Sequence, residues 1–358
     1  MKAIKYPLLV FALLILTFLL FVYAVNFHPP TIKSVPVIKR AKAPLLQPGQ
    51  KLTILSWNVQ FFAGNKSNHF AFEGGHDRWP TKLTVKRTLR QSISLIKKAN
   101  PDVIVLQELQ KKSVMSAKIN QLNRTLSLLP TTYANYSCAY YLKSAFVPDA
   151  HYWGPVDQLL CIISKFNIQH ANRRALPSRL NTNFIVQQFQ PKRAVLTAIL
   201  PVTNGTDLHI INTHFSAFSQ GTDTIKQQAK ITYDIMQNIQ KKGGAAILAG
   251  DFNLLGHTKL KRFVQPQDQA MYEHTASPLT NYFISFNAFP NLQQITGPDK
   301  QRYATYIAKN KKIKKADRTI DFIFITHNLS YEKQQVLQKN SSTLSDHYPL
   351  LATIKLPS

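Results

Sequence analysis

The chain has 358 residues, of which 44% are hydrophobic and 17% are charged, so its composition excludes a disordered polypeptide and allows a full core. Its formal net charge is +27, and residues 1–50 hold six basic residues and no acidic one, which leaves +21 on residues 51–358. A charge of this sign attracts polyanions such as nucleic acid or an anionic membrane surface, although a generally basic proteome would produce the same excess.

The N-terminal segment, residues 1–25, predicts a signal anchor or a signal peptide. Two lysines precede residues 8–25, which are apolar apart from Thr17. About 20 apolar residues cross a bilayer, and Val22-Tyr23-Ala24 also resembles the small-residue pattern of a cleavage site. The length of the run favours an anchor. We therefore expect an exported protein, either anchored in the inner membrane and facing the periplasm or secreted after cleavage.

Residues 26–50 contain five prolines among short basic stretches, a pattern typical of a linker. We expect this Pro/Lys-rich linker to hold the rest of the chain away from the membrane. Residues 51–358 then form one domain, whose length suits a two-sheet α+β unit. No repeat at solenoid spacing divides it.

Three segments predict helices. In residues 81–99, apolar residues recur on one stripe, and Asn100-Pro101 ends the pattern. In residues 224–242 the apolar positions share one side, and Gly243-Gly244 ends the helix. Residues 114–129 form a third, less regular candidate.

The predicted strands carry polar residues in a common layout. A near-continuous apolar run is typical of a strand buried on both faces, so a polar residue at its end emerges at the rim of the sheet. The segments are 52–57 before Asn58, 103–107 before Glu108, 208–213 before His214, 245–250 before Asp251 and Asn253, 319–324 around Asp321, and Asp346-His347 before 348–351.

A single Asp or Asn after a strand is as often a turn residue as a functional one. Six segments with the same layout indicate a site, because a carboxylate at the end of a buried strand is costly unless it is paired or bound to a cation. Carboxylate and amide oxygens suit a hard cation such as Mg²⁺.

The chain contains two cysteines, Cys138 and Cys161, which exclude a cysteine zinc site of the usual four-ligand kind. They form one disulfide if the domain is exported, or they remain two separate buried thiols. The sequence leaves both alternatives open.

Five ordered segments resemble the endonuclease/exonuclease/phosphatase superfamily, which includes deoxyribonuclease I, abasic-site endonucleases, bacterial sphingomyelinases and inositol polyphosphate phosphatases. They are Trp57-Asn58-Val59-Gln60, Gln107-Glu108, Asn212-Thr213-His214, Gly250-Asp251-Phe252-Asn253 and Ser345-Asp346-His347-Tyr348-Pro349. The resemblance covers Lys51–Pro357. It implies an α/β (α+β) fold, a four-layer sandwich of two mixed β-sheets flanked by helices, and a catalytic domain at residues 51–358.

The resemblance also implies a metal site. Glu108 would be the principal Mg²⁺ ligand with Asn58 beside it, and Asp346 would complete the site directly or through water. This fits Mg²⁺ chemistry, because the ion keeps several waters and takes only one or two protein carboxylates. Mn²⁺ is the alternative cation.

The same resemblance implies roles for five catalytic residues. Asp251 would orient or deprotonate the attacking water, and Asn253 would hold that water or a phosphoryl oxygen. His214 would donate to a non-bridging oxygen, where charge develops in the transition state. His347 would be paired with Asp321, which fixes the ring tautomer. The general base is either His347 or Asp251.

Three weaker candidates for substrate contact have plain structural alternatives. Asn212 would hydrogen-bond near the phosphate or tie down a turn. Arg78 lies in a loop, residues 63–80, that would hold substrate or be solvated, and Tyr303 would stack on a base or pack in the core. A basic run at residues 309–318 would grip phosphates or form a solvated turn.

The reaction expected is Mg²⁺-dependent phosphodiester hydrolysis, and two substrate classes remain. The charge and the segment Asn58-Val59-Gln60, which resembles deoxyribonuclease I, favour a nuclease acting on DNA or RNA. The membrane segment and the Asn212-Thr213-His214 motif favour a sphingomyelinase- or inositol-phosphate-type hydrolase at a membrane. A catalytically idle scaffold is a third possibility, which the complete set of polar residues disfavours. No oligomerisation signal is evident, and we expect a monomer.

Overall fold

The computed structural model describes residues 5–64, 70, 79–179, 182–217, 221–272, 276–307 and 315–358. One sheet consists of β2 (Val37–Lys39), β3 (Lys51–Asn58), β4 (Val103–Leu109), β5 (Asn135–Val147), β6 (Gly154–Ser164), β13 (Ser330–Val336) and β14 (Leu350–Lys355). The other consists of β1 (Ile32–Ser34), β7 (His170–Ala175), β8 (Ala194–Leu200), β9 (Leu208–His214), β10 (Ala245–Asp251), β11 (Asn287–Phe289) and β12 (Asp321–Ile325). Their orders are β13-β14-β3-β4-β6-β5-β2 and β1-β7-β8-β9-β10-β12-β11.

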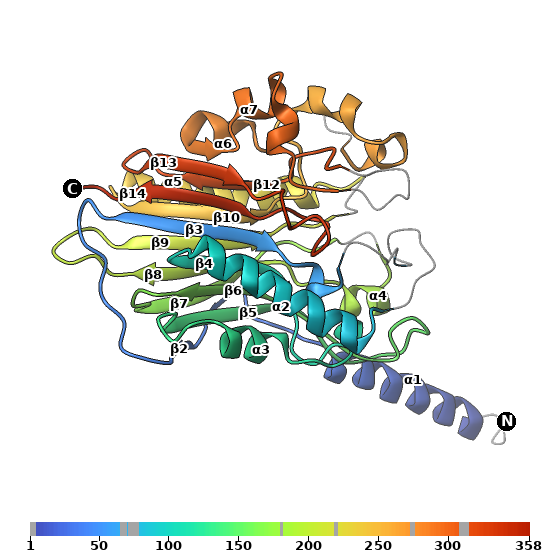
Figure 1. Ribbon diagram of the computed structural model, residues 1–358. Helices are drawn as coiled ribbons and strands as arrows, with labels where there is room; N and C mark the ends of the chain where they lie inside the picture. The colour runs from blue at the N-terminus through green and yellow to red at the C-terminus, as the bar shows by residue number, and fades with distance from the viewer. Residues whose placement is uncertain are drawn as a thin grey trace.

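Helices cover the outer faces of the two sheets (Figure 1). The α-helices are α1 (Lys5–Val25), α2 (Lys82–Ala99), α3 (Gln121–Leu128), α4 (Phe184–Phe189), α5 (Thr224–Lys241), α6 (Thr280–Ser285) and α7 (Leu292–Thr296). Short 3₁₀ turns are η1 (Gln60–Phe62), η3 (Val114–Ser116), η4 (Thr258–Phe263), η5 (Pro266–Tyr272) and η6 (Lys300–Tyr303).

Three apolar cores separate these layers. The inward faces of both sheets form one core, in which Leu52, Ile210 and Ile247 are fully buried. A second core lies between α2, α3 and the first sheet, and a third lies between α5, α6 and the second sheet. Because most of the central strands pack on both faces, they are apolar along nearly their whole length. The predicted four-layer sandwich is confirmed.

The strand directions bring the polar strand ends together. In each sheet a central pair is parallel, β3 with β4 and β9 with β10. Parallel strands end at the same edge of their sheet. The two edges lie together, because Asn58 contacts Asp251 and His214 contacts Glu108 across the sheets. β12 runs antiparallel to β10 and begins there, with Asp321 directly opposite Asp251. Asp321 is therefore the first residue of its strand. The sequence had placed it inside the strand instead.

Two of the three predicted helices are confirmed as α2 and α5. The third prediction, a helix over residues 114–129, is wrong. Ser113 caps a single 3₁₀ turn, and Ala117 and Lys118 then have φ values of 52° and 57°, which end the helical path. Asn120 caps a new helix, α3, by accepting a hydrogen bond from the backbone N–H of Asn123.

Residues 26–50 differ from the predicted spacer. β1 pairs with β7 at the edge of one sheet, and β2 pairs with β5 at the edge of the other. Leu46 is fully buried in the core between the sheets, and Arg40 donates hydrogen bonds to the carbonyls of Leu126 and Tyr133. The segment therefore lies along the domain as a strap and does not act as a free tether.

Helix α1 is long and apolar enough to cross a membrane over Tyr6–Val25. Its last turn contacts the domain: Val22 is fully buried, and the Ser144 hydroxyl donates to the carbonyl of Val25 over 3.3 Å. The rest of the helix projects away from the sandwich (Figure 1).

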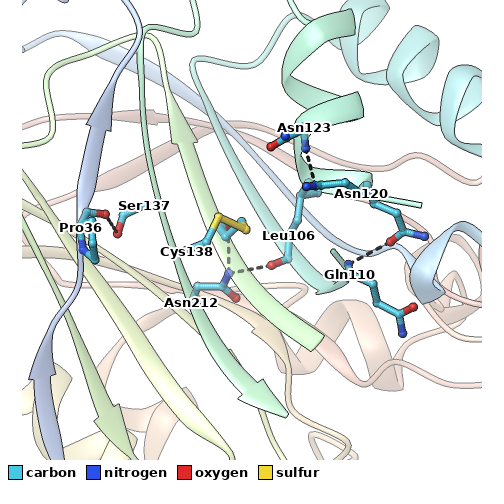
Figure 2. The surroundings of a disulfide bond; sticks show 10 residues. Pro36, Leu106, Gln110, Asn120, Asn123, Ser137, Cys138 and Asn212 are labelled. Atoms are coloured by element: carbon cyan, nitrogen blue, oxygen red, sulfur yellow. Dashed lines mark hydrogen bonds between the residues drawn. A yellow bond between two sulfur atoms is a disulfide. The ribbon is translucent and has the colours of Figure 1, made fainter. Parts of the chain in front are cut away.

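The two cysteines form a disulfide between paired positions of β5 and β6, which decides between the alternatives left open by the sequence. Figure 2 shows the Asn212 side chain next to this bond. The Asn212 amide donates to the carbonyls of Leu106 and Cys161, at 2.9 and 3.0 Å, and accepts from the Gln107 side chain at 2.8 Å. Asn212 is fully buried and joins the two sheets, so of the two alternatives left open by the sequence the structure favours a structural role over contact with substrate.

We predict that Asn212→Ala destabilises the protein by about 1–3 kcal/mol, because buried partners lose their hydrogen bonds. The measurement is the urea midpoint of the oxidised protein at unchanged slope. Asn123→Ala, at an exposed position on α3, is the matched control and should change stability by less than ~0.5 kcal/mol. Equal effects of the two substitutions would contradict the cross-sheet role.

Candidate active site

The edge at which β3, β4, β9 and β10 end holds a buried polar cluster, which we call the catalytic edge. The predicted site residues that meet there are Asn58, Glu108, His214, Asp251, Asn253, Asp321, Asp346 and His347. Apart from Glu108 and Asn253, which are partly exposed, each is at most 5% exposed. The layout predicted from the strand ends is therefore present as one constellation.

Asp251 lies at the centre of the cluster. Its Oδ2 accepts a hydrogen bond from the Asn58 amide at 3.1 Å and lies 3.3 Å from His214 Nε2 and 3.6 Å from His347 Nε2. Its Oδ1 accepts from the backbone N–H of Asn253 at 2.9 Å. Burial raises the pKa of Asp251 to about 6, although the charge of His347 opposes the rise.

Gly250 allows β10 to lie close to β9 next to Asp251. A Cβ atom at residue 250 would lie 2.1 Å from the carbonyl oxygen of Thr213 on the neighbouring strand. Only glycine therefore lets β9 and β10 approach closely enough to hold His214 beside Asp251.

His347 is held by Asp321. Its Nδ1 lies 2.9 and 3.1 Å from the two carboxylate oxygens, so Nδ1–H donates to Asp321 and Nε2 faces Asp251. Burial opposes a charged ring, but three carboxylates outweigh it and hold the pKa of His347 well above its ordinary value. These carboxylates belong to Asp321, Asp251 and Asp346. The ring is therefore an imidazolium at neutral pH.

The pKa of His214 is shifted in the opposite direction from that of His347. Burial, followed by the positive charges of Arg193 and His347, holds the pKa of His214 well below its ordinary value. Its Nδ1 lies 3.3 Å from the hydroxyl of Tyr141, whose pKa is raised well above its ordinary value by burial. A protonated Tyr141 hydroxyl can donate to Nδ1, which leaves the ring proton on Nε2, facing Asp251 and Glu108. The neutral ring is then a donor at the catalytic edge.

Glu108 and Asp346 form the acidic side of the site. β4 has a register irregularity between Leu106 and Leu109, and Glu108 has a φ of 61°, in the left-handed region. This local distortion sets the direction of the Glu108 side chain. Burial and the nearby Asp346 carboxylate raise the pKa of Glu108 to about 7. The side chain remains 19% exposed.

These residues fit a hard divalent cation. Asp346 accepts a hydrogen bond from the Gln60 amide nitrogen at 2.8 Å, and Gln60 Oε1 is buried without a hydrogen-bond partner among the described residues. Two neighbouring carboxylates and an unused buried amide oxygen are the kind of oxygen ligands that Mg²⁺ favours. Glu108 and Asp346 are therefore suited to hold the cation expected from the sequence.

The Asn58 amide is oriented differently from a ligand. Its nitrogen donates to Glu108 at 3.2 Å and to Asp251, while its oxygen accepts from the backbone N–H of Gln60 at 3.0 Å. An amide binds a cation through oxygen, so direct coordination would require this amide to turn over. In the arrangement seen here, Asn58 holds the two carboxylates in place.

Ligand-type atoms of Asp251, Asp321 and His347 also lie within 4.8 Å of one another. A histidine must be unprotonated to bind a metal. Because His347 donates from Nδ1 to Asp321 and its pKa is held well above its ordinary value, this trio is a poorer metal site than Glu108 and Asp346.

The weaker substrate candidates have mixed outcomes. Arg78 lies outside the described residues, as does most of the basic run. Tyr303 is half-buried and packs against two cores, which agrees with the packing alternative. Arg318, at the end of the basic run, is 4% exposed and paired with Asp317 and Asp268 at 2.7 and 2.6 Å, so this residue neither contacts phosphate freely nor lies in a solvated turn.

Sequence reasoning missed three residues of the site. Gln60 lies in a motif that was recognised, but its contact with Asp346 depends on the left-handed η1 turn. Tyr141 is one of several aromatic residues on β5, and Arg193 precedes β8 without a distinguishing motif. Arg193 lies 5.0 Å from the Tyr141 ring and donates to the His214 carbonyl at 3.5 Å. Only the fold brings these two to His214.

The comparisons with known proteins agree with this geometry. The model of the endonuclease/exonuclease/phosphatase family matches residues 55–347. No curated protein matches the chain. The fold is similar to an endonuclease/exonuclease/phosphatase from Beutenbergia cavernae, with 18% identity and a TM-score of 0.58 over 86% of this chain and 72% of that one.

Two further solved structures share the fold. The human nocturnin catalytic domain with bound sulfate has 15% identity and a TM-score of 0.52, covering 89% of this chain and 96% of its own. ANGEL2, a 2′,3′-cyclic phosphatase, has 16% identity and a TM-score of 0.54, covering 91% and 99%.

We predict that Asp321→Asn lowers the pKa of His347 and reduces turnover of a generic phosphodiester by about 10–100-fold, because the ring loses its charged partner. Histidine-selective NMR titration and bis-p-nitrophenyl phosphate hydrolysis measure the two effects. Asp149→Asn is the matched control, because Asp149 contacts His151 Nδ1 at 3.0 Å in an exposed pair. Loss of activity with an unchanged His347 titration would contradict the positioning role.

Proposed function

The chain belongs to the endonuclease/exonuclease/phosphatase family of phosphoric ester hydrolases, and on that premise we propose that it is a divalent-cation-dependent phosphodiesterase. The observation that carries the proposal is the set of nitrogens around Asp251. The Asn58 amide, the neutral His214 and the charged His347 all lie within 3.6 Å of its Oδ2. An ionised carboxylate in this position can take a proton from a water molecule, and that water then attacks the phosphoryl group in line.

The histidines have separate roles in this proposal. Asp251 is the general base, because His347 already holds a proton. The His347 imidazolium and the Nε2–H of His214 donate to phosphoryl oxygens, where negative charge grows in the transition state. Asn253 binds the attacking water or a phosphoryl oxygen, and Asp321 keeps His347 oriented and charged.

Glu108 and Asp346 hold the cation, with Asn58 supporting them. A bound Mg²⁺, or Mn²⁺ in its place, would neutralise negative charge on the phosphoryl oxygens. A cation there would also balance the negative charge of these carboxylates, since burial and then the Asp346 carboxylate raise the pKa of Glu108 to about 7.

The first substrate candidate is a nucleic acid, DNA or RNA. The formal charge of the whole chain is +27, a field that attracts a polyanion to the site. The second candidate is a phospholipid or inositol-phosphate ester, which is favoured by one observation: α1 is attached to the domain at β5, the strand that carries Tyr141. A monomer is sufficient for either activity, because one chain supplies the whole site.

We propose that the domain is exported and faces the periplasm from the inner membrane. The apolar helix α1 supports an anchor, and the Cys138–Cys161 disulfide supports an oxidising compartment. The attachment of Val22 and Val25 to the domain favours a retained anchor over a cleaved signal peptide.

EDTA should abolish hydrolysis of bis-p-nitrophenyl phosphate, and Mg²⁺ or Mn²⁺ should restore it. Asp251→Ala and His347→Ala should each reduce the rate by ~10²-fold or more, because each removes a proton-transfer or charge-stabilising group. His151→Ala, at an exposed histidine, is the control and should leave the rate unchanged. A rate within about tenfold of wild type for either site variant would overturn the proposal.

The substrate class is tested with the full-length chain in detergent micelles, given plasmid DNA, RNA and sphingomyelin in parallel. A nuclease should degrade nucleic acid in a cation-dependent way and lose affinity steeply as salt rises. Hydrolysis of sphingomyelin without loss of nucleic acid would favour the second candidate. Turnover of bis-p-nitrophenyl phosphate confirms in each preparation that the site is intact.

A further inference from the structure

The end of α1 is fixed to the domain. Val22 is fully buried, the Asn26 side chain donates to the Val22 carbonyl at 2.8 Å, and Ser144 on β5 donates to Val25. Asn26 also forms a backbone bridge with Ser144, and β1 begins at Ile32, only six residues further on. Because so little chain separates α1 from the sheets, the membrane that α1 enters must lie at a defined side of the domain.

An apolar surface lies at that side. α4 contacts both α1 and β5, yet three successive apolar residues of α4 point into solvent. Phe184, Ile185 and Val186 are 56%, 39% and 46% exposed, and no residue of α4 is buried. An exposed apolar helix of this kind needs a partner, since water is an unfavourable surrounding for it.

The turn between β5 and β6 adds an aromatic residue. Trp153 is 69% exposed, and its ring lies 5.3 Å from that of Phe146. Val156 pairs with Ser144, where α1 is attached, so Trp153 lies three residues before the position opposite Ser144. Exposed tryptophan is typical of the boundary between lipid and water.

The charge beside this surface suits a bilayer. Lys143 is exposed and precedes Ser144 on β5, at the level where α1 leaves the domain. A lysine near the surface of an anionic membrane is attracted to its head groups. Apolar residues next to a basic one, beside a membrane helix, form the composition of an interfacial contact.

We propose that α4 and the β5–β6 turn rest in the head-group region of the bilayer that α1 enters, so that the catalytic edge faces the membrane surface. We call the surface of Phe184, Ile185, Val186 and Trp153 the docking surface. Tyr141, whose hydroxyl contacts His214, lies on β5 three residues before Ser144. β3 ends at Asn58 on the side of the molecule from which α1 leaves (Figure 1). The anchor and the docking surface together hold the site close to the lipid.

The test uses the full-length protein reconstituted into vesicles of phosphatidylcholine and phosphatidylglycerol, with and without brominated acyl chains. Brominated lipid should quench tryptophan emission, and Trp153→Phe should remove most of that quenching. Of the other two tryptophans, Trp57 is buried and Trp79 is half-buried. Ile185→Lys should also reduce the quenching, because a charge lifts α4 away from the acyl chains.

Ile284→Lys is the matched control. Ile284 is 71% exposed on α6, at the opposite side of the molecule from α1 (Figure 1), and its substitution should leave the quenching unchanged. Hydrolysis of soluble bis-p-nitrophenyl phosphate should be the same in all variants, so a failure of docking is distinguished from a failure of catalysis. Quenching that is equal in wild type, Trp153→Phe and Ile185→Lys would overturn the proposal. A dimer that Ile185→Lys converts to a monomer would assign the surface to a second copy and would also overturn it.

Discussion

The structure depends on the burial of four carboxylates in one small region. Asp251, Asp321 and Asp346 are each at most 5% exposed, and Glu108 lies beside them. Such a group of like charges is unfavourable unless each oxygen has a donor or a cation close to it. The protein meets this requirement with the His347 ring, the amides of Asn58 and Gln60, and backbone N–H groups such as that of Asn253. Glu108, whose pKa is raised to about 7 by burial and the Asp346 carboxylate, is where the proposed cation would bind.

The two histidines show how this burial creates function. Both are at most 4% exposed, yet one is held positive and the other neutral. Burial opposes a charge on both rings, but three carboxylates outweigh it at His347, whereas the positive charges of Arg193 and His347 add to it at His214. The surroundings therefore set two chemically identical side chains to different protonation states, a few ångströms from the same Asp251 oxygen. In the proposed mechanism, Asp251 is then the group that accepts a proton from water.

Much of this site follows from strand periodicity and order in the sequence. Apolar runs that end in polar residues predicted the catalytic edge, because parallel strands end at one rim. Three features depend on geometry that periodicity does not encode. Asp321 reaches the edge because β12 runs antiparallel to β10, and Gln60 does so through left-handed backbone at η1. Asn212 belongs to a motif that indicated a functional role, but its side-chain amide donates to two carbonyls of the other sheet. For the basic run that ends at Arg318 the sequence left a phosphate contact or a solvated turn open, whereas two aspartates pair with the buried Arg318 in the fold.

The segment before the domain changes how the site relates to its surroundings. A free proline-rich linker would have allowed the catalytic edge to point in any direction relative to α1. Instead, β1 and β2 pair with the edges of the two sheets and hold this segment against the domain. β5 then joins the features of this side of the molecule: Ser144 receives the end of α1, Cys138 is bonded to β6, and Tyr141 contacts His214. The proposed anchor and the candidate site therefore meet on one structural element, β5.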